Sequence, residues 1–284
     1  MKNISVTLDV EDLRSSDRYE DRSRAMTEKV LDLFLEMEVR ATIFVVGDVA
    51  KKHPEMLLRA SEEGHEIGLH SHKHIPLQLL NPQDFKKEVE DSRNFLQEAT
   101  GQEIKGFRAP TMSLTYQTRW AIPILQEIGF TYSSSILPAK NPLYGWDGMP
   151  TCPFKWLDSV IEFPCPVTSI LGVKIPYLGG AYFRLFPTFF RKMGVRRSST
   201  KEVLWAYCHP WEFDPEEEYY KLDHVGSLTS RIAWIGRSNM ENKMRSFLKD
   251  ASVSSLGDIC QTMNLSELEI VDPESPVTRN KKLL

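Results

Sequence analysis

The sequence predicts a single α/β domain built of parallel βα units. Short apolar runs typical of strands alternate with segments of helical periodicity through the first half of the 284 residues. Ionisable residues follow several of these runs, as at Asp9, His70 and His209. Strands joined by helices run parallel, and in such folds ligands collect at the carboxyl ends of the strands. We therefore expect these side chains to meet at one end of the sheet.

Composition and charge exclude several classes of protein. With 41% hydrophobic and 26% charged residues the chain is typical of a globular protein, and a net charge of −4 argues against binding to nucleic acid. No apolar run approaches the ~20 residues that span a bilayer, and the N-terminus lacks the apolar stretch of a secretory signal. Four scattered cysteines indicate reduced thiols. We expect a cytoplasmic protein without a transmembrane segment.

The first half contains three strand candidates separated by helices. Residues 4–10 alternate apolar and polar side chains, and apolar residues then recur at helical spacing between Met26 and Met37. Residues 41–46 form a short apolar run that predicts a buried strand. Pro54 suits the first turn of a helix that ends at Gly64. Residues 66–69 predict a third strand that leads directly into a histidine cluster.

The remaining elements are a helix, two strands, an irregular insert and two further helices. These predictions fall in order on residues 82–99 (helix), 104–108 (strand), 138–187 (insert), 203–208 (strand), 230–249 and 256–263 (helices). The insert is rich in proline and aromatic residues and has little helical period, so we expect irregular excursions and short strands there. The domain is expected to span residues 1–271, and the polar segment 272–284 is expected to be a C-terminal tail.

The histidine cluster is the strongest chemical signal. Four of the seven histidines fall between positions 65 and 74, and three carboxylates follow the first strand. Two neutral imidazoles and one carboxylate suit Zn²⁺ or another first-row divalent ion, and open coordination positions make such a site catalytic. The residues thus predict a divalent metal, with Zn²⁺ favoured.

Four motifs give the chain a resemblance to a known family. They are Asp9-Val10-Glu11-Asp12, His70-Ser71-His72-Lys73-His74, Arg108-Ala109-Pro110 and the strand that ends in His209. In order and spacing they resemble the NodB-like polysaccharide deacetylases of carbohydrate esterase family four, over roughly residues 3–215. The resemblance implies a distorted barrel of the NodB-homology type. It also implies metal-dependent removal of an N-acetyl group from a sugar, with release of acetate.

The resemblance also implies roles for particular residues. His70, His74 and Asp12 match the metal ligands, and Asp9 matches the catalytic base. Glu11 remains the competitor for either carboxylate role, because family members with an Asp-x-Asp pattern align differently.

Two further residues complete the expected site. Arg108 is expected to hold the base ionised, and His209 to protonate the departing amine. Of the other histidines in the cluster, His72 is expected outside the ligand set and His65 to be structural.

One position departs from the family pattern. The family's fourth motif supplies an aspartate that tunes the acid histidine, and this chain has Ser133 there. A serine cannot stabilise an imidazolium as a carboxylate does. Either another carboxylate serves, with Glu212 and Asp214 as candidates, or the acid step is weakened.

Other sequence features place the chain within the family. The stretches Gly179-Gly180-Ala181-Tyr182-Phe183-Arg184 and His209-Pro210-Trp211-Glu212 resemble a branch associated with bacterial exopolysaccharide and surface-glycan biosynthesis. The expected partner is an N-acetylated sugar. There are two alternatives. One is a catalytically degenerate glycan-binding protein, which the serine at position 133 favours, and the other is an allantoinase-like hydrolase of a non-sugar amide. Core packing is expected for the aromatic residues Tyr144, Trp146 and Trp156.

Overall fold

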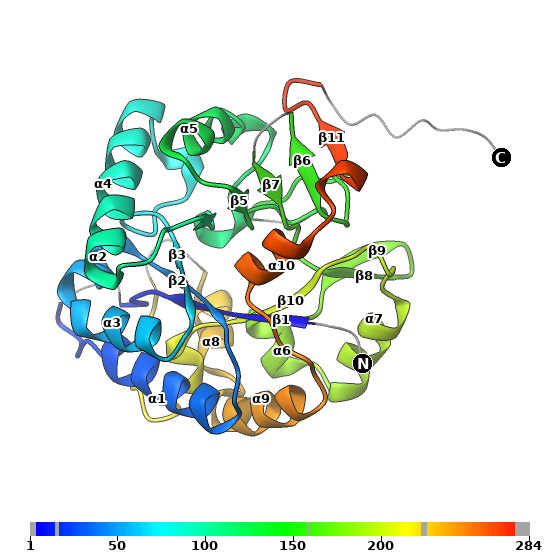
Figure 1. The fold of residues 1–284 in the computed structure, drawn as a ribbon. Helices are drawn as coiled ribbons and strands as arrows, with labels where there is room; N and C mark the ends of the chain where they lie inside the picture. The colour runs from blue at the N-terminus through cyan, green and yellow to red at the C-terminus, as the bar shows by residue number, and fades with distance from the viewer. Residues whose placement is uncertain (1–3, 15–16, 142, 158–159, 223–225, 276–284) are drawn as a thin grey trace.

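The computed structural model contains a strongly curved nine-stranded sheet ringed by helices (Figure 1). It describes residues 4–14, 17–141, 143–157, 160–222 and 226–275. Along the sheet the strands follow the order β10-β1-β2-β3-β4-β5-β7-β6-β11, and β8 pairs with β9 in a separate hairpin. The strands are β1 Ile4–Val10, β2 Thr42–Val45, β3 Glu66–Leu69, β4 Gly106–Phe107, β5 Tyr132–Ser133, β6 Phe154–Trp156, β7 Ile161–Glu162, β8 Val167–Ile170, β9 Val173–Pro176, β10 Leu204–Cys208 and β11 Glu269–Val271.

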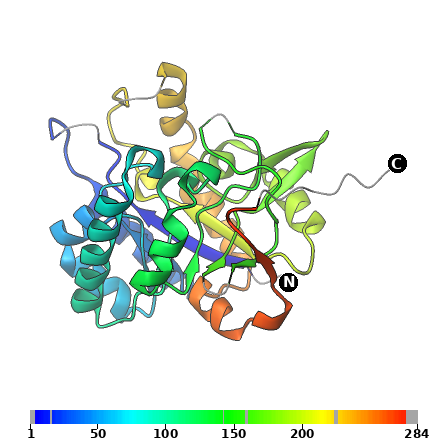
Figure 2. The ribbon, with the colours of Figure 1, turned by 90° about the horizontal axis from the view of Figure 1, so that it is seen from above.

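Ten α-helices are described, and those of the first half cover the outer face of the sheet (Figures 1 and 2). None of the described helices is long and apolar enough to cross a bilayer. The helices are α1 Ser23–Glu36, α2 Gly47–Lys52, α3 Pro54–Glu62, α4 Pro82–Thr100, α5 Ala121–Ile128, α6 Gly180–Leu185, α7 Thr188–Arg197, α8 Ser227–Trp234, α9 Met240–Lys249 and α10 Leu256–Thr262.

The sheet is the distorted barrel that the sequence predicts. Its strands pair in parallel except at β6, which runs antiparallel to β7. The terminal strands of the order, β10 and β11, are not recorded as paired in the described residues. Closure instead uses single contacts: the Trp205 indole of β10 donates to the Pro164 carbonyl at 3.0 Å, and Gly179 forms an isolated bridge with Tyr207.

Strand β1 carries the polar side chains that line the inside of the barrel. All seven of its residues are buried, although the sequence alternates apolar and polar residues. Ser5, Thr7 and Asp9 share one side of the strand because successive side chains point to opposite faces. That side faces the barrel interior, where Thr7 and Asp9 both accept hydrogen bonds from Arg108. Asp9, the carboxylate of this strand, is therefore already paired with Arg108 where it reaches the site.

The second half of the chain differs from the sequence prediction in its helices and in its insert, and the expected tail is described only in part. The expected helix over 230–249 is two helices, α8 and α9, separated near Gly236, whose φ of +82° is a left-handed conformation that ends a helix. The expected insert 138–187 supplies β6 and β7 to the main sheet, and is therefore part of the barrel. Of the expected tail, residues 272–275 are described, and Glu274 pairs with Arg119 at 2.7 Å; the rest lies outside the described residues.

Candidate active site and metal centre

Glu11, His70 and His74 converge at the carboxyl ends of β1 and β3. One ligand atom from each lies within 4.8 Å of the others. Glu11 Oε2 lies 2.5 Å from His74 Nε2, yet this buried oxygen has no partner with hydrogen-bond geometry. Such an orphaned carboxylate oxygen facing two imidazoles is the arrangement of ligand atoms that converge on a cation. These three residues, which we call the Glu-His-His triad, fit a divalent metal.

The backbone around the triad fixes the orientation of both histidines. His70 Nδ1 lies 2.9 Å from the Arg108 carbonyl, which acts as the acceptor and leaves the Nε2 lone pair facing the site. His74 has a φ of +55°, and its backbone N–H donates to the Ser71 hydroxyl at 3.1 Å. This left-handed turn directs the His74 ring back toward Glu11. A non-glycine residue rarely adopts such a φ, and here the unusual conformation places the His74 ring beside Glu11.

Asp9 and Arg108 form a buried ion pair beside the triad. Arg108 is fully buried, and its Nη1 donates to Asp9 Oδ1 at 2.5 Å. The guanidinium also donates to the Thr7 hydroxyl at 2.7 Å and lies 4.2 Å from the centre of the Phe44 ring. The second oxygen of Asp9 lies 4.0 Å from His70 Nε2. Arg108 thus fixes the position of Asp9 through one carboxylate oxygen and leaves the other directed at the site.

His209 faces the triad from the end of β10, the strand that pairs with β1. Its Nε2 lies 3.8 Å from Glu11 Oε1, and its Nδ1 lies 3.0 Å from Glu212 Oε2. Its ring stacks on Trp211 with centroids 4.8 Å apart, and the Trp211 indole donates to Glu11 Oε1 at 2.9 Å. Sequence reasoning gave Trp211 no role of its own, although it belongs to the motif that follows His209.

The charges around His209 favour its protonated form. Burial lowers the pKa of His209, but Glu11 and then Glu212 outweigh burial and raise it to about 9. Burial likewise opposes ionisation of Glu11, and the neighbouring His74 and His209 still hold its pKa well below the usual range. Burial lowers the pKa of His70 to about 4, so this ring is neutral and available as a ligand near pH 7.

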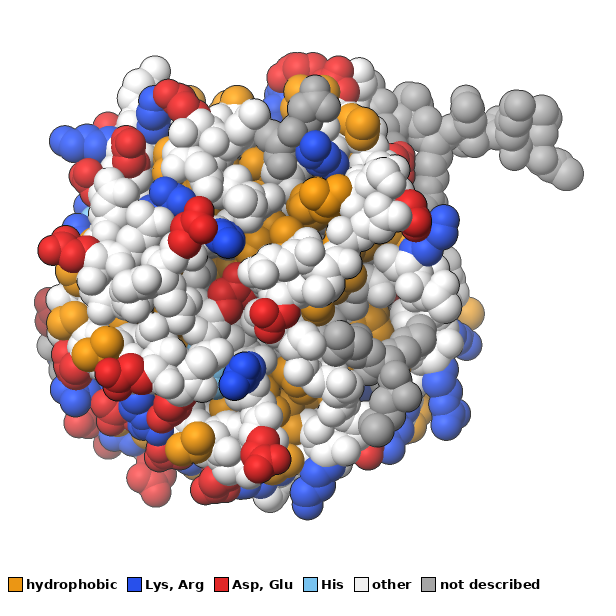
Figure 3. Space-filling model, in the orientation of Figure 1, with side chains coloured by type: hydrophobic (Ala, Val, Ile, Leu, Met, Phe, Trp, Pro, Cys, Tyr) orange, Lys and Arg blue, Asp and Glu red, His pale blue; other side chains and the backbone are white. Residues whose placement is uncertain are grey.

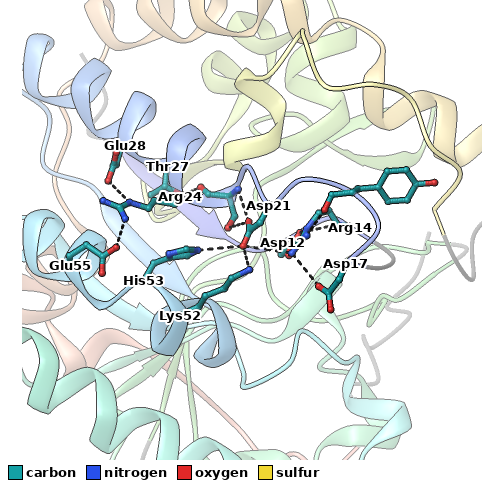
Figure 4. A network of polar contacts seen from close by, with 12 residues as sticks. Asp12, Arg14, Asp17, Asp21, Arg24, Thr27, Glu28, Lys52, His53 and Glu55 are labelled. Atoms are coloured by element: carbon teal, nitrogen blue, oxygen red, sulfur yellow. Dashed lines mark hydrogen bonds and ion pairs between the residues drawn. The ribbon is translucent and has the colours of Figure 1, made fainter.

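Asp12 does not join the triad, which differs from the expected ligand set. Its carboxylate accepts from Arg14 Nε at 3.0 Å and from Nη2 at 2.6 Å. Figure 4 shows Arg14 inside a wider network in which Asp21 also contacts Lys52 and His53. Strand alternation explains the difference, because Asp9 and Glu11 are two residues apart and share one face, whereas Asp12 falls on the other.

The remaining histidines of the cluster lie outside the triad, as expected. His72 Nδ1 lies 3.0 Å from the Ser92 hydroxyl, and its Nε2 lies 3.2 Å from Asp48. His65 is buried and accepts from the Ala41 backbone N–H at 3.0 Å. Both side chains therefore stabilise local structure beside the site.

Ser133 belongs to a different hydrogen-bond network from His209. Its hydroxyl donates to the Ser135 hydroxyl at 2.8 Å, and Ser135 N–H in turn donates to the buried Glu162 at 2.6 Å. The carboxylate that contacts His209 comes instead from Glu212, three residues along the chain. Of the two carboxylates named from the sequence, the structure brings Glu212 to the imidazole and pairs Asp214 with Arg22 at 2.5 Å.

The triad, Asp9 and His209 line one cavity of about 400 Å³. Its catalytic end is polar, and its walls are mostly apolar, with Tyr144 and Tyr182 among them. By contrast, Trp146 and Trp156 are buried in the core, as their expected packing role requires. A sugar-sized ligand can reach the triad through this cavity.

Family models divide the chain into two adjacent segments. Residues 4–133 match polysaccharide deacetylase, and residues 134–261 match a domain of unknown function (DUF3473). The boundary falls at the end of β5, and in the one sheet the first segment's strands, β1 to β5, are flanked by β10 on one side and by β7 and β6 on the other. The two segments therefore form one barrel, and His209 comes from the second. The match over residues 4–133 confirms, for that segment of the chain, the resemblance to polysaccharide deacetylases read from the sequence.

Individual relatives agree with this assignment. The chain is 32% identical over 96 residues to a peptidoglycan-N-acetylglucosamine deacetylase of Bacillus cereus, a match covering 34% of this chain and 35% of that protein. The matched segments span about a third of the length of such curated relatives.

Solved structures show the same fold at lower sequence identity. A candidate polysaccharide deacetylase from Mycobacterium smegmatis superposes with a TM-score of 0.61 at 20% identity, covering 94% of this chain and 92% of that one. A family-four pseudoenzyme from Bacillus anthracis superposes with a TM-score of 0.52 at 13% identity, covering 95% of this chain and 69% of that one.

Proposed function

We propose that the protein removes an N-acetyl group from an N-acetylated sugar of bacterial surface-polysaccharide biosynthesis by hydrolysing the amide bond. The observation that carries the proposal is the convergence of the Glu-His-His triad, the Asp9–Arg108 pair and His209 on one cavity. Together these groups supply a metal site, a base and an acid, a combination that can hydrolyse an amide at neutral pH.

Glu11, His70 and His74 are the proposed ligands of a divalent ion, with Zn²⁺ favoured by the donor set. When bound, the ion would polarise the amide carbonyl and lower the pKa of a water molecule. Trp211 and the Arg108 carbonyl support the triad by bonding Glu11 Oε1 and His70 Nδ1. These contacts fix the two ligand side chains before the ion arrives.

Asp9 is the proposed base, and His209 the proposed acid. Arg108 holds one oxygen of Asp9 in place, and the other oxygen can accept the proton of the attacking water. His209 is protonated near neutral pH and can donate its Nε2 proton to the departing sugar nitrogen. Without that proton the amine is a poor leaving group, because it would depart as an amide anion.

Glu212 is the proposed replacement for the carboxylate that Ser133 cannot provide. It is fully buried, and one of its oxygens lies 3.0 Å from both the backbone nitrogen and Nδ1 of His209. Its other oxygen accepts from Arg184 Nε at 2.6 Å. This carboxylate can hold the proton on Nδ1 and leave Nε2 facing the site, which supports an active enzyme over a degenerate one.

Acetate release tests the function. The zinc-loaded protein should release acetate and an equal amount of free amine from chitooligosaccharides or N-acetylated nucleotide sugars, and a chelator should remove the activity. His209→Ala should reduce the rate about 10²- to 10⁴-fold without loss of zinc, as expected for an acid. A zinc-free protein that binds these sugars and leaves them unchanged would instead establish the glycan-binding alternative.

The ligand assignment predicts that Asp12 is dispensable for metal binding. Asp12→Asn should retain one zinc per chain and change the rate by less than about threefold, because Asp12 is bound by Arg14 outside the triad. Zinc content by mass spectrometry and acetate release provide the two readouts. Loss of zinc from Asp12→Asn would contradict the triad and restore the ligand set expected from the sequence.

A further inference from the structure

A basic and apolar face lies on α7 and the β8–β9 hairpin, away from the triad. Figure 1 places α7 beside this hairpin at the edge of the molecule, and Figure 3 shows Lys and Arg side chains gathered along that edge. Arg197 of α7 donates to the Ser169 carbonyl of β8 at 3.5 Å, which joins the two elements. We call this the α7 face, made up of Leu171, Phe189, Lys192, Met193, Arg196 and Arg197.

The outer side of α7 mixes apolar and cationic side chains. Phe189, Lys192, Met193 and Arg196 recur at i, i+3, i+4 and i+7, so they form one stripe along the helix, and together with Arg197 they line one surface hollow. The opposite side is anchored in the protein. There Arg191 lies 4.0 Å from the centre of the Phe183 ring, and Gly194 packs on Tyr177. The stripe is therefore held rigidly outward, with Phe189 70% exposed.

The tip of the β8–β9 hairpin has a leucine at a position whose backbone conformation is unfavourable for leucine. Leu171 has a φ of +49° and the next residue, Gly172, a φ of +82°, so both central residues of the turn are left-handed. Such turns favour asparagine followed by glycine, whereas leucine is strained there. The Leu171 side chain is also 100% exposed and buries nothing within the protein. An apolar side chain that costs stability and gains no internal packing points to an external contact.

We propose that the α7 face binds the surface of a bilayer that contains anionic lipids. Apolar side chains beside lysine and arginine on a helix are the combination that inserts at a lipid headgroup boundary, where the cations contact lipid phosphates. The charge is local, because the whole chain carries a net charge of −4. One carboxylate, Asp250, forms an ion pair with Lys192 of this face at 3.2 Å. The inference does not depend on the proposed function.

Vesicle sedimentation tests the proposal. The full-length protein should bind phosphatidylcholine vesicles containing about 30% phosphatidylglycerol, release them at about 0.5 M salt, and bind pure phosphatidylcholine weakly. Arg196→Glu with Arg197→Glu should weaken binding about 25-fold or more, because each cation at an anionic surface contributes about fivefold. The matched control, Lys51→Glu with Lys87→Glu, makes the same charge change elsewhere on the surface.

Leu171→Asn separates binding from folding. Asparagine suits the left-handed turn, so the variant should unfold at the same or a higher temperature and still bind vesicles several-fold more weakly. Leu79→Asn, which changes a leucine that is 74% exposed elsewhere, should bind normally. Each α7-face variant should deacetylate a soluble oligosaccharide at the wild-type rate. Failure of the wild type to bind anionic vesicles, or equal binding by these variants and their controls, would overturn the proposal.

Discussion

Asp9→Asn is expected to slow acetate release about 10³-fold while zinc remains bound, as removal of a general base does. Asparagine keeps an oxygen that can accept from Arg108, but it has no useful proton affinity. Arg108 would then lack its 2.5 Å counterion, so the variant should also unfold at a lower temperature. Single-turnover rates and zinc content, measured below the unfolding transition, check both expectations.

The matched comparison for this prediction is Glu11→Gln. Both carboxylates are buried on one face of the first strand, but Glu11 belongs to the triad and Asp9 pairs with Arg108. Loss of rate with zinc retained marks a base, and loss of zinc marks a ligand. If Asp9→Asn lost its zinc and Glu11→Gln kept it, the two roles would be exchanged.

Glu212→Gln is expected to have the second large effect, on both folding and pH dependence. Three donors point at this carboxylate, two from His209 and one from Arg184, so an amide would place its NH₂ against a donor. Arg184 would also be left buried without a counterion, which costs about 3–5 kcal/mol of folding free energy. Chemical denaturation measures this loss.

The pH dependence follows from the raised pKa of His209. In the metal-free protein the imidazolium is present below about pH 9 and is lost as the pH rises through that value. A cation held by Glu11 would offset the charge that raises this pKa most, so the activity of the zinc-loaded protein that needs the acid should decline at a pH below 9. By linkage, His209 stabilises the fold fully below its ordinary pKa of 6.5, and this contribution fades toward pH 9. Removing the Glu212 charge should lower the His209 pKa and move the alkaline limb of the rate profile to lower pH.

Asp214→Asn is the control for Glu212. Asp214 is two residues away, but it pairs with Arg22 and does not contact the imidazole in the described structure. It should leave the alkaline limb in place. NMR titration of the His209 ring in the metal-free protein reads the pKa directly, and an unchanged value in Glu212→Gln would refute the role given to Glu212.

The sequence predicts the first half of the fold well because the hydrophobic periodicity and the prolines and glycines that bound the helices indicate the same elements there. β1 and β3 have the predicted bounds, and α3 and α4 begin at the predicted prolines. The second half is harder because its strands β6 and β7 are only two or three residues long, and each takes one of its partners, β11 or β5, from a distant segment. Strands this short contain too few residues to show an alternation of apolar and polar side chains in the sequence.

The residues of the candidate site also divide into those that the sequence could identify and those that it could not. His70, His74, Arg108 and His209 could be found from motifs, since each ends a strand or follows one at fixed spacing. The carboxylates could not be assigned by a gapless match to the family pattern, which favours Asp12. Strand alternation and the arginine two residues beyond Asp12 were the available signals, and both favour Glu11. The contact between Glu212 and His209 depends on a tight turn after β10, which only the structure shows.

Zinc titration of the metal-depleted protein tests the central claim most directly. Acetate release should rise in proportion to added Zn²⁺ and level off at one ion per chain, and Glu11→Gln should need at least about 100-fold more zinc. Asp12→Asn should follow the wild-type curve. Full activity without metal, or identical zinc curves for Glu11→Gln and the wild type, would contradict a deacetylase site built on Glu11, His70 and His74.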